Sequence, residues 1–296
     1  MTINALARFT VPLEKRAALE KLCRVPGASP MVLGLLIAST GGVIVADILA
    51  VLGYFNLGWT CLLNTFLMYW QFTVAHDSIH RSAAKNQKLN DLFGHIGMAT
   101  FAPQISLGIF RWAHIQHHRF TNGPKDPDNW MHGPWWSLPA RWSLLEIGYL
   151  LFIMKNRDPI AMRHLRGTLL NAAITLTIAA ALTYLGYGMH VLLLWFIPSR
   201  LVFILVGCVF FWLPHVKDDV ESAQDLTLAT SMRLGHEWLL TPLCQYHNYH
   251  LIHHLFPTMP AYQHVKAWQL LEPELRQRNL QIQHGFAIQP VIHLAT

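Results

Sequence analysis

The sequence has little charge. Asp, Glu, Lys and Arg make up 13% of its 296 residues, whereas hydrophobic residues make up 53%. Soluble domains of this size usually carry about 25% charged residues. The composition therefore excludes an ordinary soluble globule, and the same hydrophobic content excludes disorder. The net charge of +6 does not indicate a nucleic-acid partner, because basic charge in such a chain must first be tested against membrane topology.

Cysteine is also scarce. The four cysteines are scattered, with no C-x-x-C pair, at Cys23, Cys61, Cys208 and Cys244. This arrangement favours neither a disulfide framework nor a thiolate metal site. Histidine, by contrast, occurs 18 times and exceeds the 16 acidic residues. A hydrophobic chain rich in histidine indicates a membrane protein that binds metal through imidazole.

Four stretches are apolar enough to be membrane spans, which need about 20 mostly apolar residues. They cover residues 31–54, 57–75, 168–187 and 191–213. Short uncharged turns join the first to the second and the third to the fourth, so we expect two helical hairpins. Polar groups within the spans are expected to form interhelical hydrogen bonds, and they are Asp47, Asn64 and Arg200.

Two further stretches, residues 89–110 and 135–154, are apolar but carry charged or polar residues. We expect them to lie as helices at the membrane interface. The prediction is an all-α membrane protein with one domain over residues 1–296. It has four transmembrane helices in two hairpins, interfacial helices, and a cytoplasmic helical cap that carries the histidine clusters.

Basic residues indicate the orientation. Of 22 Lys and Arg residues, five lie in residues 1–30, eleven in residues 76–167 and five after residue 213, and neither hairpin turn carries one. The positive-inside rule then places both termini and residues 76–167 in the cytoplasm. We expect a multi-pass integral membrane protein, in the inner membrane if the source is bacterial. The first thirty residues are mixed and charged, so no cleavable signal sequence is expected.

Histidines gather in three short motifs. HDSIH gives His76 and His80, and residues i and i+4 share one helical face. The other two motifs are WAHIQHHRF and HNYHLIHHLFP, in which H-x-x-H-H again presents several imidazoles from one helix. They supply His114, His117, His118, His250, His253 and His254.

All three motifs fall on the predicted cytoplasmic side, so they can converge beneath the bilayer. Eight imidazoles are too many for one zinc ion, which takes four ligands. They suit two metal ions with positions left for oxygen and substrate, and imidazole without thiolate is compatible with iron. A ninth ligand is expected at His215, where the last span ends, with His236 and His247 as alternatives.

Carboxylates near the motifs could orient metal-binding histidines through hydrogen bonds. They are Asp77, Asp126, Asp128, Asp218 and Asp219, although loop carboxylates in solvent are an equally good interpretation of the KDPDNW segment. Isolated histidines are expected to be solvated or hydrogen-bonded, and these are His95, His132, His164, His190, His264, His284 and His293.

Two other metalloprotein classes fit less well. HDSIH has Asp where zinc proteases have Glu, and Leu240 stands where a motif beginning at His236 would need its second histidine. A histidine-rich metal transporter would place histidines within several spans, and the predicted spans contain none.

With these motifs in place, the chain resembles the membrane fatty acid desaturase superfamily. The matching segments are HDSIH, FRWAHIQHHRFTN followed by DPD, WLPH and HLIHHLFPTMP, and the resemblance covers roughly residues 45–265. It implies a di-iron centre, molecular oxygen and two electrons. It also implies nine iron ligands, at His76, His80, His114, His117, His118, His215, His250, His253 and His254.

The superfamily includes acyl desaturases, acyl hydroxylases and carotenoid ketolases and hydroxylases. The second and third motifs look more like acyl desaturases, whereas HDSIH and the short chain are also similar to carotenoid ketolases. The resemblance therefore implies O₂-dependent oxidation of an unactivated C–H bond in an apolar chain. Fatty acyl desaturation of a lipid or thioester is favoured, and oxygen insertion is the alternative.

The sequence contains no haem-binding or four-cysteine iron–sulfur segment. A separate ferredoxin, rubredoxin or small haem cytochrome is therefore implied as electron donor. Three basic residues, Arg111, Arg119 and Lys125, could hold an anionic head group of the substrate, and positive-inside topology accounts for them equally well.

Overall fold

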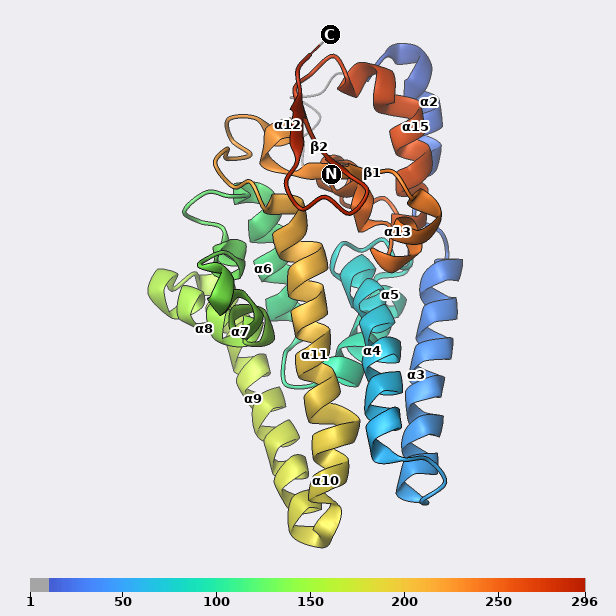
Figure 1. Cartoon of the computed structure of the whole chain (residues 1–296), viewed down its shortest axis with the longest axis vertical. Coiled ribbons are helices and arrows are strands. Elements are labelled where there is room, and N and C mark those ends of the chain that lie inside the picture. Colours follow the sequence, from blue (N-terminus) through green and yellow to red (C-terminus); the bar gives the residue numbers. More distant parts are fainter. Residues whose placement is uncertain (1–10, 296) are drawn as a thin grey trace.

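The computed structural model describes residues 11–295, and helices dominate it. Two long helical hairpins form its lower half, and a cap of short helices and strands lies above them (Figure 1). The first hairpin pairs α3 (Pro30–Val51) with α4 (Leu57–Ile79). The second pairs α9 (Pro159–Leu182) with a returning helix that contains α10 (Gly188–His190) and α11 (Ile197–Val206). The four helical stretches of the sequence therefore form the two expected hairpins.

The hairpin ends follow local sequence signals. The Ser29 side chain accepts a hydrogen bond from the Val32 amide at the start of α3, and Asn56 accepts from the Gly58 and Trp59 amides at the start of α4. The second hairpin reverses at Gly186, whose φ of 91° is easily adopted by glycine alone. Three π-helical segments accompany this hairpin, at Thr183–Tyr187, Val191–Phe196 and Gly207–Trp212.

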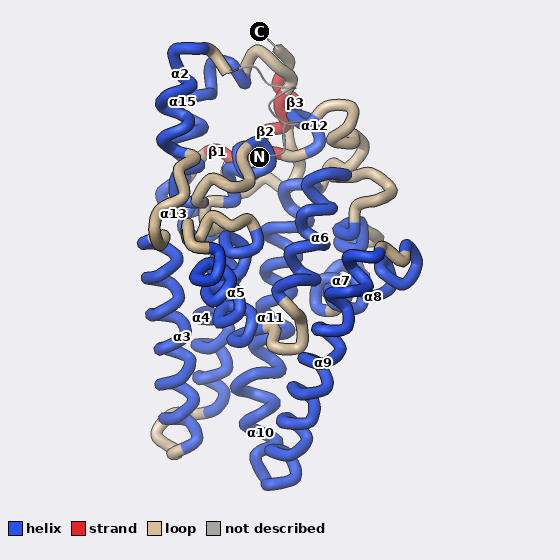
Figure 2. The backbone as a smooth tube through the Cα atoms, turned by 180° about the vertical axis from the view of Figure 1, so that it is seen from behind, coloured by secondary structure: helices blue, strands red, loops and turns tan. Residues whose placement is uncertain are grey.

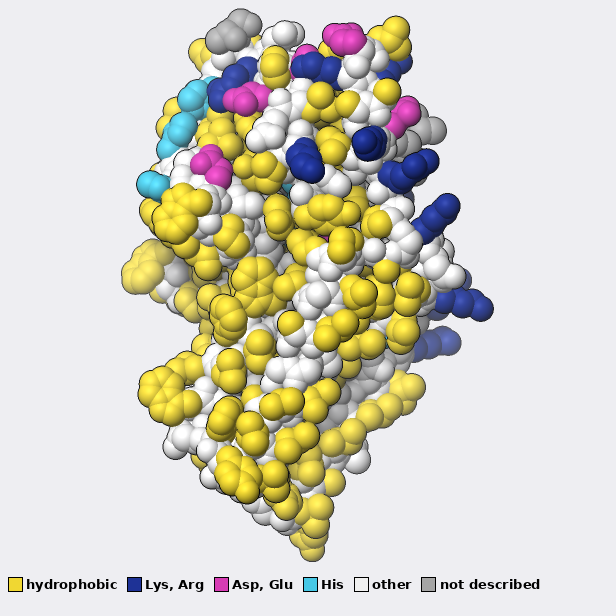
Figure 3. Space-filling model, turned by 90° about the vertical axis from the view of Figure 1, so that its right-hand side faces the viewer, with side chains coloured by type: hydrophobic (Ala, Val, Ile, Leu, Met, Phe, Trp, Pro, Cys, Tyr) yellow, Lys and Arg dark blue, Asp and Glu magenta, His cyan; other side chains and the backbone are white. Residues whose placement is uncertain are grey.

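The apolar surface lies on the hairpins. Within residues 11–295, two helical stretches are long and apolar enough to cross a membrane, at 30–51 and 159–215, and each contains an 18-residue window with a mean hydropathy of 2.2. The second stretch contains both arms of a hairpin, since the chain reverses at Gly186. In Figure 3, hydrophobic side chains cover the lower part of the visible face, and the charged side chains lie higher. The helix α4 is not among these stretches. The four-span topology and its orientation are therefore kept as predictions.

Polar groups inside the hairpins make hydrogen bonds to other helices, which confirms the expected interhelical hydrogen bonds. The Asn64 amide donates to Asp47 Oδ1 at 2.7 Å and to the Leu194 carbonyl at 2.9 Å, so it joins α3, α4 and the returning helix. Arg200 of α11 donates to the Ser143 carbonyl and forms an ion pair with Glu146. These contacts tie the hairpin helices to one another and to the two short helices that carry Ser143 and Glu146.

The two expected interfacial stretches form short helices beside the hairpins. Residues 89–110 belong to α5 (Gln87–Phe101) and the start of α6 (Leu107–Phe120). Residues 135–154 contain a short turn (Trp135–Ser137), α7 (Leu138–Ser143) and most of α8 (Leu145–Asn156). Figure 2 shows α7 and α8 lying to one side of the second hairpin. None of these helices is long enough to span a membrane, although their position at an interface stays a prediction.

The cap contains a small sheet that the all-α prediction missed. Its strands are β1 (Ser231–Leu234), β2 (Leu280–His284) and β3 (Val291–His293). Their order is β1-β2-β3, with β1 parallel to β2 and β3 antiparallel to β2. The C-terminal stretch from residue 260 is therefore helical only in its first part, up to Leu275, and contributes β2 and β3 to the sheet.

Short helices complete the cap and surround the sheet. They are α2 (Leu13–Leu22), α12 (Leu226–Ala229), α13 (Glu237–Leu243), α14 (His250–Leu255) and α15 (His264–Leu275). Single 3₁₀ turns occur at Pro127–Met131, Leu213–His215, His247–Tyr249 and Ala261–Gln263. A buried core that includes Ile252, Leu271 and Ile282 holds α14 against α15 and the sheet. This packing fixes the helix that carries the third histidine motif.

Candidate metal centre

The three histidine motifs and His215 meet where the hairpins join the cap. The first motif ends α4, the second lies on α6, and the third lies on α14. His215 closes the 3₁₀ turn that follows the returning helix. Eight of these nine histidines are buried, and His118 is half-buried. The structure therefore brings together all nine residues that the sequence singled out.

One set of four, here called the first group, comprises His76, His80, His114 and His253. Each offers a ring nitrogen, and these four nitrogens lie within 4.8 Å of one another. His118 adjoins them, because its Nε2 lies 3.1 Å from the Nε2 of His114 and 3.0 Å from that of His253. Five imidazoles thus face one small volume.

The other set, the second group, comprises His117, His215, His250 and His254, again with ring nitrogens within 4.8 Å of one another. The Nε2 of His250 lies 3.1 Å from that of His215 and 3.1 Å from that of His254. The two groups adjoin through His118, which lies next to the first group and whose ring centre is 4.2 Å from that of His254.

The nitrogen contacts fit metal ions better than a hydrogen-bond network. A neutral imidazole has a single N–H, which points at one acceptor. The Nε2 of His114 nevertheless approaches two others, those of His76 and His118, at 3.1 Å each. Nitrogens bound to one metal at about 2.0–2.1 Å would be roughly 2.9–3.4 Å apart in tetrahedral or octahedral shells. The observed spacing lies in this range.

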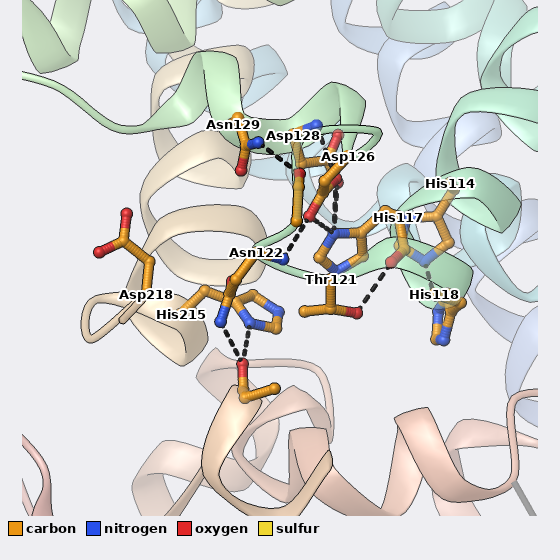
Figure 4. Close-up of polar contacts among 12 residues, drawn as sticks. His114, His117, His118, Thr121, Asn122, Asp126, Asp128, Asn129, His215 and Asp218 are labelled. Atoms are coloured by element: carbon orange, nitrogen blue, oxygen red, sulfur yellow. Dashed lines mark hydrogen bonds and ion pairs between the residues drawn. The ribbon is translucent and has the colours of Figure 1, made fainter. Parts of the chain in front are cut away.

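Two histidines of the second group are oriented through their other ring nitrogen. The Nδ1–H of His117 donates to Asp126, 2.9 Å from Oδ2 and 3.1 Å from Oδ1 (Figure 4). The Nδ1–H of His215 donates to the Ala229 carbonyl at 2.9 Å. Metal-binding histidines usually make such bonds to a carboxylate or carbonyl. The structure therefore favours the orienting role for the DPD segment over a solvated loop.

Electrostatics in the site follow from burial. Burial lowers the pKa values of His250, His253 and His254 well below the usual value, and neighbouring imidazoles lower them further. The lowered pKa values favour the neutral ring, which is the form that binds metal. Burial also acts to lower the pKa of His117, but the carboxylates of Asp126 and Asp128 outweigh it and raise that pKa to about 9.

The remaining predicted carboxylates differ in position. Asp77 is buried, with Oδ1 3.7 Å from the Nδ1 of His76, so it lies near the first group. Asp218 is half-exposed and faces His132 at 3.3 Å, whereas Asp219 pairs with Lys217 at 3.9 Å. The ion-pair partners of these last two carboxylates are not among the nine histidines.

The predicted basic residues are not equivalent either. Arg111 donates to Asp91 and to the carbonyls of Ser78 and Ile79, so its guanidinium ties α6 to α4 and α5. Arg119 and Lys125 are exposed. The contacts of Arg111 argue against a head-group role for this residue, and the prediction is kept for Arg119 and Lys125.

Two histidines lie closer to the site than the sequence indicated. His247, considered only as an alternative to His215, is 2% exposed, and its Nε2 lies 3.3 Å from that of His76. His264, expected to be solvated or hydrogen-bonded, is 1% exposed, with its ring centre 5.7 Å from that of His253. His236 is exposed and stacks on Phe286 instead. The spacing of three residues between His247 and His250 could have indicated in the sequence that His247 lies near the site.

Phenylalanine side chains line one side of the first group. The ring centres of Phe72 and His76 are 5.6 Å apart, and those of Phe211 and His114 are 6.1 Å apart. Phe110 lies 6.2 Å from His114, and Phe210 packs on Phe72 at 4.4 Å. All four phenylalanines are buried. The imidazoles therefore border an apolar, water-poor region.

Comparison with known proteins identifies relatives of two kinds. The chain is 27% identical over 247 residues to the sn-1 oleoyl-lipid 12-desaturase of Synechocystis, covering 71% of this chain and 68% of that protein. It is 24% identical over 236 residues to the sn-1 acyl-lipid omega-3 desaturase (ferredoxin) of Synechocystis, covering 70% and 65%. It is 28% identical over 219 residues to a beta-carotene ketolase of Paracoccus, covering 72% and 76%.

The chain thus spans about two thirds of the length of the two Synechocystis desaturases. The family model for fatty acid desaturases matches residues 54–286, a region that contains all three histidine motifs and His215. The chain therefore belongs to the fatty acid desaturase family.

Proposed function

We propose that this oxidoreductase uses O₂ and two iron ions to oxidise an unactivated C–H bond in an apolar chain, by desaturating a fatty acyl lipid or thioester. The observation that carries the proposal is the pair of adjoining imidazole groups. They lie at the junction between the apolar hairpins and the cap. Imidazole ligands without thiolate are compatible with iron.

Each residue group has a distinct task. His76, His80, His114, His118 and His253 would hold one iron, and His117, His215, His250 and His254 would hold the other. When bound and reduced by two electrons, such an iron pair supplies the O₂-derived oxidising power that no side-chain acid or base offers. Asp126 and the Ala229 carbonyl keep His117 and His215 in the tautomer that presents Nε2 to the metal.

The phenylalanine side chains that line the first group would contact the apolar substrate. Phe72 and Phe211 place apolar rings beside His76 and His114, so a hydrocarbon chain can approach this side without leaving an apolar environment. The same rings exclude water, which protects a reactive site from side reactions. A substrate dissolved in the membrane would reach the site from the hairpin side.

The proposed setting is a membrane with the cap on its cytoplasmic side. Four helices cross the bilayer in this arrangement, and both termini and the metal centre lie in the cytoplasm. The electrons come from a separate ferredoxin, rubredoxin or small haem cytochrome. The name of one Synechocystis relative, which specifies ferredoxin, supports this class of donor.

Oxygen insertion is the second candidate. The beta-carotene ketolase of Paracoccus is matched over 76% of its own length, a larger share than for either Synechocystis desaturase. A ketolase or hydroxylase would use the same metal groups on a carotenoid or acyl chain. The outcome depends on how the substrate lies relative to the irons.

Mass spectrometry of lipids and carotenoids from expressing cells tests the proposal. Desaturation removes two hydrogens from an acyl chain, whereas ketolation or hydroxylation adds oxygen. The product should disappear in His253→Ala and persist in His95→Ala, a control at an exposed histidine of α5. Oxidised product that persists undiminished in His253→Ala would contradict the proposed site.

A further inference from the structure

We propose that His247 supplies a tenth imidazole to the metal held by the first group. This inference rests on the proposed function and adds a ligand to it. His247 begins the 3₁₀ turn that leads directly into α14, and its side chain is 2% exposed. It is therefore the first residue of the HNYHLIHHLFP motif, and it lies inside the buried region rather than at its edge.

The position of the ring is the first argument. The Nε2 of His247 lies 3.3 Å from the Nε2 of His76, and the Nε2 of His76 lies 3.1 Å from that of His114. Both distances are within the roughly 2.9–3.4 Å expected between nitrogens that share one metal ion. The Nε2 of His247 is thus placed, next to that of His76, where it could bind the same metal ion.

The tautomer is the second argument. The Nδ1 of His247 lies 3.0 Å from the Gln245 carbonyl. A carbonyl only accepts, so Nδ1 carries the proton and Nε2 presents a lone pair towards His76. If the Nε2 of His76 binds metal, it has no proton to donate. Two lone pairs then face each other across 3.3 Å, an arrangement that a shared cation stabilises and that is otherwise unfavourable.

The backbone before His247 is the third argument. Gln245 and Tyr246 have φ values of 48° and 69°, both left-handed, which is uncommon for residues other than glycine. Such strain persists only where surrounding contacts enforce it, and it gathers at functional sites. Here it turns the chain so that the Gln245 carbonyl and the His247 ring meet.

The Gln245 side chain supplies the enforcing contacts. It is 1% exposed, its Nε2 donates to the Tyr69 carbonyl at 2.9 Å, and its Oε1 accepts a hydrogen bond from the Thr73 hydroxyl. Tyr69 and Thr73 belong to α4, the helix that also carries His76. The strained loop is therefore fixed to the same helix as the ring that His247 faces.

The experiment loads the full-length protein with ⁵⁷Fe and compares it with His247→Ala, His247→Gln and the control His236→Ala. Mössbauer spectra report the environment of each iron, and release to a chelator reports how tightly each is held. We expect the signal of one iron to change in both His247 variants. That iron should leave about tenfold faster or more. The other iron and the His236→Ala protein should be unchanged, and added imidazole should restore the first signal in His247→Ala.

Several results would overturn the inference. These are unchanged spectra and release rates in both variants, loss of both irons alike, or a changed signal that imidazole does not restore. His247→Gln keeps a polar side chain of similar size and so guards against misfolding of the alanine variant. An unmutated protein that binds no iron would instead reject the proposed function. The two failures are therefore distinguishable.

Discussion

The Nδ1–H of His117 donates to the carboxylate of Asp126 across 2.9 Å, and each of the two residues is 2% exposed. The carboxylate also accepts from the Asn122 and Asp128 amides, so its position is fixed by the backbone of the loop after α6. It therefore holds the His117 ring with Nε2 facing the second group. This contact links the DPD segment to the metal centre.

Replacing Asp126 by Asn should weaken iron binding without abolishing the fold. An amide of similar size keeps the volume but loses the charge, and partners of this kind are worth about 10–100-fold in metal affinity. Titration with a chelator should show this loss for one iron. Asp218→Asn is the control, because Asp218 is half-exposed and pairs with His132. Equal iron affinity in the two variants would show that Asp126 does not support the site.

Alanine substitutions should separate the two groups. His253→Ala removes a ligand of the first group, and His117→Ala removes a ligand of the second. Each variant should lose at least one iron per chain by elemental analysis and all detectable product by lipid mass spectrometry. The control His95→Ala should keep both. Full activity and full iron content in either variant would refute the ligand assignment for that residue.

The sequence was sufficient to predict that eight motif histidines and His215 converge. Each motif gathers its imidazoles on a short helical segment, a hairpin returns the chain to the same side, and His215 lies where the last span ends. It could not place His247, since that position depends on the strained backbone at Gln245 and Tyr246 and on contacts with α4. Such contacts join residues far apart in the chain, so the spacing of His247 from His250 indicated the helical face but not the contact with His76.

The fold was also predictable in part: the sequence indicated the helical hairpins but not the sheet. Long apolar runs indicated the hairpins, although the first helix ends at Val51 rather than at residue 54, and α4 continues past residue 75 to Ile79. The sheet was missed because its strands are short and because β1 pairs with β2 across nearly fifty intervening residues. Strands of three to five residues carry too little alternation to be distinguished from loops.

The Arg200–Glu146 pair offers a test of packing within the hairpin region. Both side chains are mostly buried, at 17% and 22% exposed. Arg200→Leu leaves Glu146 unpaired and should lower the free energy of unfolding by roughly 3 kcal/mol. The double variant Arg200→Leu/Glu146→Leu should recover most of this loss. Thermal unfolding in detergent measures both, and a double variant no more stable than the single one would contradict this interpretation.

Topology can be tested by labelling cysteines placed at the ends of the molecule. In a variant without the natural cysteines, Phe55→Cys and Tyr184→Cys lie near the two hairpin turns, at residues that are 44% and 92% exposed. We expect an impermeant maleimide to label both in intact cells. Lys88→Cys, at the opposite end of α4 from Phe55, should react only after permeabilisation. Labelling of all three from the same side would contradict the four-span arrangement.

The most direct test of the central claim is elemental analysis of the purified, unmutated protein, with product analysis of the membranes it came from. Two buried imidazole groups predict two irons per chain. The same membranes should contain an acyl chain that has lost two hydrogens or, for the second candidate, a chain that has gained oxygen. Stoichiometric zinc, little iron and no oxidised lipid or carotenoid would contradict the account.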